Sequence, residues 1–263
     1  MHLNNLKNYD VCLSKNTIDL ILGSILGDGS LILKKNYLNA VFMIKQSTLK
    51  YLKWKLELID PILGKTISEN KSDGSRYTQN LSWVYQSKAN EQLSKIYNFT
   101  RSKGVKVIKR TWLNMMSPLS LAIWWLDDGS IIGNGRKGRF CTHSFSEETH
   151  KILKRYLQVV WGIQSSLRKT SLNPKTKKVY SSLELDTTNL KKLIELILPY
   201  LESLPLQMWH KCILLYKDQD CQQRWISTII EKSKISKSII EQALMIKKNR
   251  WKAYVEKDIV QSL

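Results

Sequence analysis

The sequence lacks the features that mark several large classes of protein. Its four cysteines form no CxxC pair, which argues against a disulfide scaffold and against a zinc knuckle. The four histidines have no paired spacing of the kind that binds zinc. No stretch approaches the ~18 uninterrupted apolar residues that a membrane span needs, and the first residues show no basic-then-apolar secretion signal. A soluble protein of a reducing compartment is expected.

Acidic residues are also scarce. The chain of 263 residues has 42 Lys plus Arg against 22 Asp plus Glu, so its formal net charge is +20. A compact body with this excess attracts polyanions, and nucleic acid is the first expected partner, with an anionic membrane surface the second. Hydrophobic residues make up 43% of the chain, enough to fill the core of one large domain or two of ordinary size.

The chain reads as two halves that repeat one order of elements, namely helix, hairpin, helix, hairpin, helix. A helix over 17–28, capped by Ser14 or Asn16, opens the first half. Ser117 as N-cap, with Pro118 at the first helical position, opens the corresponding helix of the second half. The other expected elements are strands 30–35 and 40–47, helix 48–59, strands on both sides of 69–76, helix 88–99, strands 131–133 and 138–145, helix 147–161, strands 163–170 and 178–186, and helix 188–201.

Shared letters support an internal duplication. The residues Thr48, Lys50, Leu52, Lys53 and Leu56 recur 101 positions later as Thr149, Lys151, Leu153, Lys154 and Leu157. The expected division is an N-terminal lead 1–16, a first half 17–112, a second half 113–215 and a basic extension 216–263 of two or three helices.

A repeated motif marks the first helix of each half. The stretch "ILGSILGDG" at 21–29 is matched by "LAIWWLDDG" at 121–129, which places Asp28 and Asp128 one hundred residues apart. Gly23 and Gly27 lie one turn apart on one helix face, so a second backbone can approach closely there. If that partner is the equivalent helix, the two aspartates meet. Two close carboxylates repel unless a divalent cation neutralises them, and oxygen ligands favour Mg²⁺.

These two motifs resemble those of the LAGLIDADG homing endonucleases, in the single-chain form with two motifs that is often encoded inside mobile group I introns. The resemblance covers about residues 17–215. It implies an α+β fold, a pseudo-twofold duplication of an αββαββα unit. Two antiparallel sheets would form a DNA-binding saddle around the two packed motif helices, in a monomer with pseudo-dimeric halves.

The resemblance also implies a mechanism. Asp28 and Asp128 would bind Mg²⁺, with Mn²⁺ able to substitute, and one phosphodiester would be hydrolysed in each strand. Gly27 and Asp127, which precede the two acids, are assigned to the same metal site. A lysine near each acid would stabilise charge, and Lys106 and Lys211 occupy such places, although Lys109 and Arg110 could serve instead of Lys106. Gln46 and His143 resemble polar positions of the family's active-site pocket.

The second motif departs from the family pattern, which favours small residues at the positions of Ile123 and Asp127. Close packing must therefore come from the glycines of the first helix, while Trp124 and Trp125 are expected to point into the second half's own core. Asp127 supports two interpretations. It could support the residues that bind the metal without binding it directly. Alternatively, it could be a solvated carboxylate near the helix end, which is the commoner situation for an acid.

Basic strand residues are the expected DNA contacts, with an ordinary solvated sheet face as the alternative for each of them. They are Lys34, Lys45, Arg76, Arg139, Arg168, Lys169 and Lys178.

Three functions compete. The first is a sequence-specific endonuclease acting on double-stranded DNA with a long asymmetric target, and both motif acids favour it. The second is a maturase that helps intron RNA fold, and the third is a DNA-binding regulator without cleavage. An organellar setting, mitochondrion or chloroplast, is expected, with no membrane partner.

Overall fold

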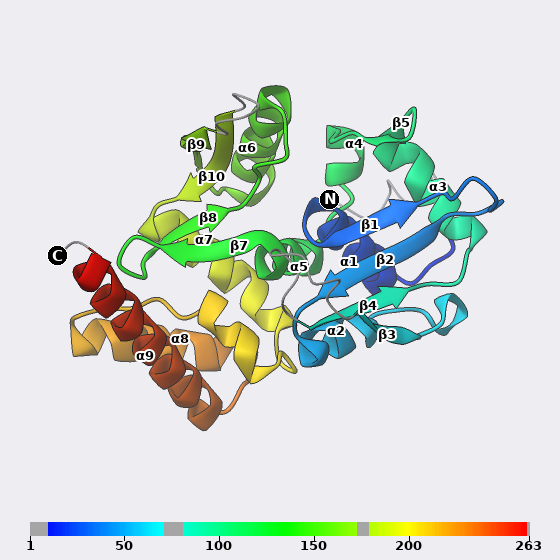
Figure 1. Cartoon of the computed structure of the whole chain (residues 1–263). Coiled ribbons are helices and arrows are strands. Elements are labelled where there is room, and N and C mark those ends of the chain that lie inside the picture. Colours follow the sequence, from blue (N-terminus) through cyan, green and yellow to red (C-terminus); the bar gives the residue numbers. More distant parts are fainter. Residues whose placement is uncertain (1–9, 71–80, 173–178, 262–263) are drawn as a thin grey trace.

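The structure is a computed structural model that describes residues 10–70, 81–172 and 179–261. Its first half contains the predicted helices and strands in the predicted order (Figure 1). They are α1 (Lys15–Leu26), β1 (Gly29–Ile32), β2 (Val41–Gln46), α2 (Leu49–Leu56), the 3-10 helix η2 (Pro61–Leu63), β3 (Ile67–Asn70), β4 (Ser82–Gln86) and α3 (Glu91–Thr100).

The second half repeats this order after a short connection. The connection holds β5 (Arg101–Ser102), β6 (Val105–Lys106) and α4 (Arg110–Leu113), which were not predicted. The repeat consists of α5 (Pro118–Asp128), β7 (Gly129–Ile132), β8 (Lys137–Phe140), α6 (Glu147–Trp161), β9 (Ser166–Leu172), β10 (Val179–Leu185) and α7 (Thr187–Ile197). Beyond it lie the 3-10 helices η3 (Leu198–Tyr200) and η4 (Leu206–Lys211), then α8 (Gln219–Ser233) and α9 (Lys237–Gln261).

The two halves build the same sheet. The strand orders are β1-β2-β4-β3 and β7-β8-β10-β9, and every pairing in both sheets is antiparallel. Each sheet starts directly after a motif helix, where Gly29 pairs with Ile44 and Gly129 pairs with Phe140. Figure 1 shows the two motif helices between the two sheets at the centre of the molecule. The predicted α+β fold with an internal duplication is confirmed.

The N-cap residues predicted from the sequence mark the observed starts of both motif helices. Ser14 caps α1 by accepting a hydrogen bond from the backbone of Thr17, and Ser117 caps α5 with Pro118 in the first turn. The predicted strand 138–145 is too long, because β8 ends at Phe140. Beyond that point Cys141 N donates to Asp128 O, and the chain turns so that Phe145 N donates to Thr142 O.

The core runs through both halves and centres on the motif helices. Every residue of α1 from Thr17 to Leu26 is buried, because α5 covers one side of the helix and the first half's own elements cover the other. Trp124 stacks on Phe140 with ring centroids 4.1 Å apart, and Trp125 meets the same ring edge-on at 5.2 Å. The tryptophans therefore fill the second half's own core, as predicted.

Close approach of α1 and α5 depends on the two glycines. A Cβ on Gly23 would lie 2.4 Å from Ser120 O, and a Cβ on Gly27 would lie 2.5 Å from Asp127 Cβ. Neither contact is possible for a real side chain, and the first of them is with backbone. The glycines of the first motif thus leave room for the larger residues of the second, as predicted.

Gly23→Ala tests this packing by the sign of its effect. In an open helix the change stabilises by about 1 kcal/mol, because alanine is the better helix former. At this contact it should instead lower the free energy of unfolding by about 1–3 kcal/mol, the usual cost of overpacking. Urea denaturation measures the difference, and a variant more stable than the parent would contradict the close packing of the helices.

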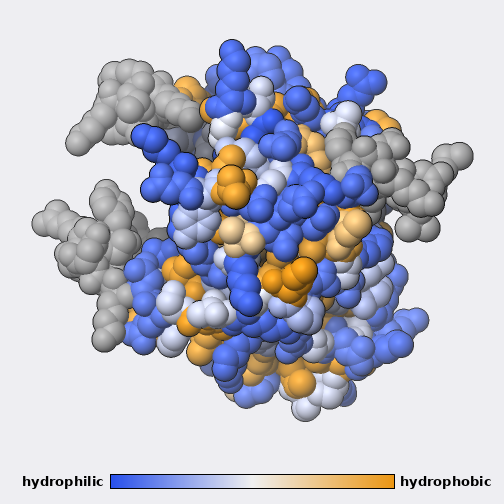
Figure 2. Space-filling model, turned by 90° about the vertical axis from the view of Figure 1, so that its right-hand side faces the viewer, coloured by the Kyte–Doolittle hydropathy of each residue, from blue (hydrophilic) through white to orange (hydrophobic). Residues whose placement is uncertain are grey.

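The C-terminal extension consists of two helices. α9 buries a stripe of Ile240, Ala243, Leu244 and Lys247, and it packs against α8 and η4. Figure 2 shows the molecule from the side of the first half, the right-hand side of Figure 1. This face is mostly hydrophilic, with hydrophobic residues in small separate groups. Among the described residues, no helix has the length and apolar content needed to cross a membrane.

Candidate active site between the two motif helices

The two motif aspartates lie where the motif helices end. Gln46 Nε2 donates to Asp28 Oδ2 at 3.0 Å, so the structure places Gln46 beside this acid. Burial raises the pKa of Asp28, and the neighbouring carboxylate of Asp127 raises it further. Burial, followed by repulsion from Asp28 and Asp127, raises the pKa of Asp128 to about 7. The two acids thus share one partly buried site in which their ionised forms are disfavoured.

One lysine caps the end of each motif helix. Lys106 Nζ donates to Ile25 O of α1 at 2.8 Å, and Lys211 Nζ donates to Leu126 O and Asp127 O of α5 at 2.6 and 3.0 Å. A cation is favoured there because the helix dipole is negative at its C-terminus. Burial lowers the pKa of both lysines, while nearby carboxylates oppose that shift.

The alternatives to Lys106 lie elsewhere. The Arg110 guanidinium donates to Asn114 Oδ1 at 3.2 Å and lies over the ring of Tyr156 at 5.3 Å. Lys109 is exposed at the start of α4. The electrostatic partner of Lys106 is instead Asp128, on the opposite motif helix. The geometry favours Lys106 over both.

The Asp127 side chain, from the second half, is buried against residues of the first half. Its interpretation as a solvated carboxylate is therefore wrong. Lys55 Nζ, on α2, contacts both carboxylate oxygens at 2.5 and 2.7 Å, and neither side chain is exposed to solvent. Tyr51 Oη donates to Asp127 Oδ1 at 2.8 Å. The backbone N–H of Asp28 donates to Oδ2 at 3.4 Å. Asp127 therefore joins the second motif to the first half and supports Asp28.

Both carboxylate oxygens of Asp127 accept hydrogen bonds from Lys55, so this side chain is held by the first half, and its assignment to the metal site stays a prediction. Within the described residues, no three His, Cys, Asp or Glu side chains are placed to hold one metal ion. Gly27 makes room for Asp127, and its assignment to the metal stays a prediction.

Sequence reasoning missed Lys55 and Tyr51, although a signal was present. In α2 the buried positions include Tyr51, Leu52, Lys55 and Leu56. A lysine on the apolar side of an amphipathic helix must find an acid or shed its charge. That position predicts a buried partner without naming it.

His143 lies in the turn after β8 and not in a strand. Its ring packs near that of Tyr180, with centroids 5.9 Å apart, and its Nε2 is buried without a hydrogen bond. The pairings Gly29–Ile44 and Gly129–Phe140 make Thr142 the counterpart of Gln46. A role for His143 in the site stays a prediction.

The predicted DNA contacts divide into several groups. Lys45 is exposed on β2, while Lys34 follows β1 and donates to Gln86 Oε1 at 3.2 Å. Arg139 pairs with Glu184 at 2.7 Å, and Arg168 approaches the same carboxylate at 3.8 Å.

Two further points limit the set. Because side chains alternate across a strand, Arg168 and Lys169 lie on opposite faces of β9 and cannot both line one surface. Arg76 and Lys178 fall outside the described residues.

The two motif helices pack against each other, and each has one acid at its C-terminal end. Each helix leads into one of two equivalent sheets. These features define an internally duplicated α+β protein of the LAGLIDADG type. The chain belongs to the LAGLIDADG DNA endonuclease family, whose model matches residues 18–197. The structure also resembles that of the homing endonuclease I-WcaI bound to its DNA recognition sequence. The TM-score is 0.65 at 19% identity, over 80% of this chain and 93% of that one. The family and fold expected from the motifs are confirmed.

Two curated relatives are much longer than this chain. The chain is 28% identical over 204 residues to "Protein RecA" of Mycolicibacterium flavescens, covering 72% of this chain and 45% of that protein. It is 30% identical over 174 residues to "Cytochrome b mRNA maturase bI2" of Saccharomyces cerevisiae, covering 60% of this chain and 39% of that protein. The chain thus spans less than half the length of these relatives.

The raised pKa of Asp128 predicts a stability effect in metal-free protein. The folded state keeps the proton up to about pH 7, whereas an unfolded aspartate releases it near its ordinary value of 3.8. Stability is therefore lost as pH rises from about 4 to 7. Asp128→Asn should raise the free energy of unfolding at pH 8 by a few kcal/mol, since each pKa unit is worth about 1.4 kcal/mol. Denaturation in EDTA measures it, and an equal gain at pH 4 and pH 8 would contradict the assignment.

Proposed function

We propose that this protein is a sequence-specific endonuclease that cuts both strands of a DNA duplex, hydrolysing one phosphodiester in each. One observation carries the proposal. Asp28 and Asp128 come from separate helices into one partly buried site, and a lysine holds each helix end beside them. Membership of the LAGLIDADG DNA endonuclease family supports the reaction class.

The donor set fits a divalent cation. Asp28 and Asp128 offer carboxylate oxygens, the ligands that Mg²⁺ prefers. Burial and repulsion from neighbouring carboxylates raise the pKa of both acids, so their charged forms are disfavoured, and a bound cation would stabilise those forms. Asp28 and Asp128 would hold Mg²⁺, or Mn²⁺ in its place, which supplies Lewis-acid stabilisation of the phosphate and a more acidic bound water.

The chain's own residues divide the remaining work. Gln46 fixes the carboxylate of Asp28 through its amide, and the buried pair of Asp127 and Lys55 holds the neighbouring backbone. Lys106 and Lys211 place positive charge beside the two acids, where negative charge develops on the phosphate in the transition state. Neither lysine needs to transfer a proton for this role.

Sequence recognition is assigned to the sheets. The saddle would place exposed strand residues such as Lys45 and Arg168 against the major groove, whose base edges carry a readable donor and acceptor code. The two halves present different side chains, so the target should be long and asymmetric. The division into halves 17–112 and 113–215, in a monomer with lead 1–16 and extension 216–263, is part of the proposal.

A maturase acting on intron RNA is the second candidate, alone or alongside cleavage. The similarity to "Cytochrome b mRNA maturase bI2" from two yeasts favours it, at 30% and 29% identity. The same similarity supports the proposed organellar setting, mitochondrion or chloroplast.

Incubation with a randomised duplex DNA library tests the leading proposal. In Mg²⁺ the protein should enrich cleaved molecules that share one long sequence, and EDTA should abolish the enrichment. Failure to enrich any sequence in Mg²⁺ or Mn²⁺ would overturn the proposal, and binding to structured intron RNA would then support the maturase.

A further inference from the structure

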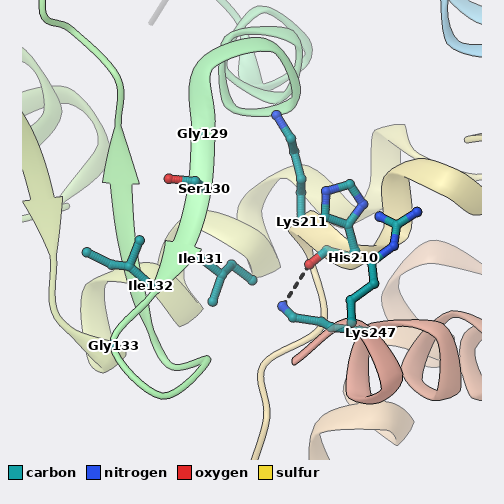
Figure 3. Close-up of a pocket in the computed structure, with 9 residues that line it drawn as sticks. Gly129, Ser130, Ile131, Ile132, Gly133, His210, Lys211 and Lys247 are labelled. Carbon is teal, nitrogen blue, oxygen red and sulfur yellow. Dashed lines mark hydrogen bonds between the residues drawn. The ribbon is translucent and has the colours of Figure 1, made fainter. Parts of the chain in front are cut away.

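A pocket of about 500 Å³ lies between β7 and the C-terminal extension. One wall is the edge strand β7, which contributes Ile131 and Ile132 directly after the second motif. The opposite wall comes from η4 and α9, where Figure 3 shows Lys247 directed toward the strand, Lys211 directed toward the end of α5, and His210 beside Lys211. The pocket thus lies between the end of the second motif and the C-terminal extension. The proposed function assigns no role to this extension.

The basic wall of the pocket is built and fixed. Lys247 is 8% exposed, and its Nζ donates to His210 O at 2.8 Å and to Ile213 O, which holds α9 against η4 (Figure 3). His210 Nδ1 is bonded to Gln207 O at 2.6 Å. Arg250 lines the pocket one turn beyond Lys247 and is exposed. The wall therefore has a fixed base and one exposed cationic side chain.

Charge in the pocket is unbalanced. The basic residues His210, Lys211, Lys247 and Arg250 all line it, and none of the described residues that line it is acidic. Repulsion from the other three adds to burial in lowering the pKa of His210 to about 4. Burial lowers the pKa of Lys247 to about 7, so Arg250, which is exposed, is the side chain of this set best placed to meet an anion, and a bound anion would favour the charged forms of the buried basic groups. The Ile131 side chain offers apolar surface beside this anion position (Figure 3), which suits an ester of phosphate better than a free ion.

Continuity with the active site points to the source of the anion. Lys211 lines the pocket, while its Nζ holds the end of α5 beside the motif acids. A nucleic-acid strand with one phosphate at Asp128 therefore carries further phosphates that can reach this pocket. Phosphodiesters are held in this way by arginine and lysine, without regard to base sequence.

We infer that this pocket binds a backbone phosphodiester of the nucleic acid next to the proposed cleavage site, with Arg250 as its principal contact. The extension 216–263 is then part of the nucleic-acid interface. This inference rests on the proposed function, because it needs a nucleic-acid strand at the motif acids.

Salt dependence of binding gives the test, with Mg²⁺ omitted so that no strand is cut. A random-sequence DNA duplex and a structured RNA serve as separate probes. For the polymer that occupies the pocket, Arg250→Ala should reduce the slope of log affinity against log salt by about one unit, the counterion released at one phosphate. Arg250→Lys should keep the slope. The matched control is Lys248→Ala, which removes one charge from an exposed position of the same helix outside the pocket.

The outcomes separate the two proposals. If the parent cleaves the randomised library but Arg250→Ala keeps its slope with both polymers, the pocket inference is overturned and the endonuclease stands. Equal slope losses in Arg250→Ala and Lys248→Ala would also overturn it, since the effect would be one of overall charge. If the parent binds neither polymer, both proposals fall.

Discussion

Asp128→Asn should abolish double-strand cleavage, with a rate loss on the order of 10³-fold or more, equivalent to ~4 kcal/mol of transition-state stabilisation. The carboxylate is proposed to hold the metal at one scissile phosphate, and an amide of the same size cannot replace its charge. Binding of the DNA target should survive, because affinity is assigned to the strands and the basic surface. Cleavage rates under single-turnover conditions and affinity in Ca²⁺ measure the two effects separately.

Companion variants sharpen this result. Asp28→Asn should give a loss of the same size, because the two acids are related by the internal duplication. Lys106→Ala and Lys211→Ala should give smaller losses, since water and metal can replace part of their charge stabilisation. Cleavage of both strands by Asp128→Asn at the parent rate in Mg²⁺ would sink the mechanism, and the maturase would become the leading function.

Lys55→Met should lower the free energy of unfolding by about 3–5 kcal/mol, the usual cost of leaving one partner of a buried ion pair uncompensated. The side chains of Lys55 and Asp127 are both inaccessible to solvent, and of the side chains that the structure describes, Tyr51 and Gln46 would remain as donors to the carboxylate. Lys53→Met is the matched control, because Lys53 is exposed on the same helix. Its effect should stay within about 0.5 kcal/mol.

A double variant distinguishes the pair from simple loss of packing. Lys55→Met with Asp127→Ala removes both charges, so it should recover much of the stability that the single change loses. Urea denaturation of the four proteins in this cycle gives the coupling. Additive losses in the double variant would show that the two side chains do not support each other.

Local patterns in the sequence predicted most of the fold. Helix period, N-caps such as Ser117, and turn residues act within a few positions of the chain, so they predict where elements begin and in which order. The duplication then related the two halves, and together with the close approach that Gly23 and Gly27 allow, it predicted that Asp28 and Asp128 meet. Element ends were less well predicted, and β8 stops at Phe140 because its partner β7 begins at Gly129, directly after the helix α5.

The supporting residues of the site depended on contacts that no local pattern encodes. Lys55 meets Asp127 across 72 positions of the chain, and Lys106 and Lys211 reach the motif helices across 81 and 85. Burial on the apolar side of α2 shows that Lys55 needs a partner, but not which one.

By itself, the sequence determined the two motif helices, their acids and the repeated order of elements, because these depend on residues close together in the chain. Only the tertiary structure decided that Asp127 is buried against Lys55 and that α9 closes a basic pocket beside β7. The reason is physical. A charged side chain takes its role from the partners that folding brings within hydrogen-bond distance, and those partners come from elements far apart in the chain.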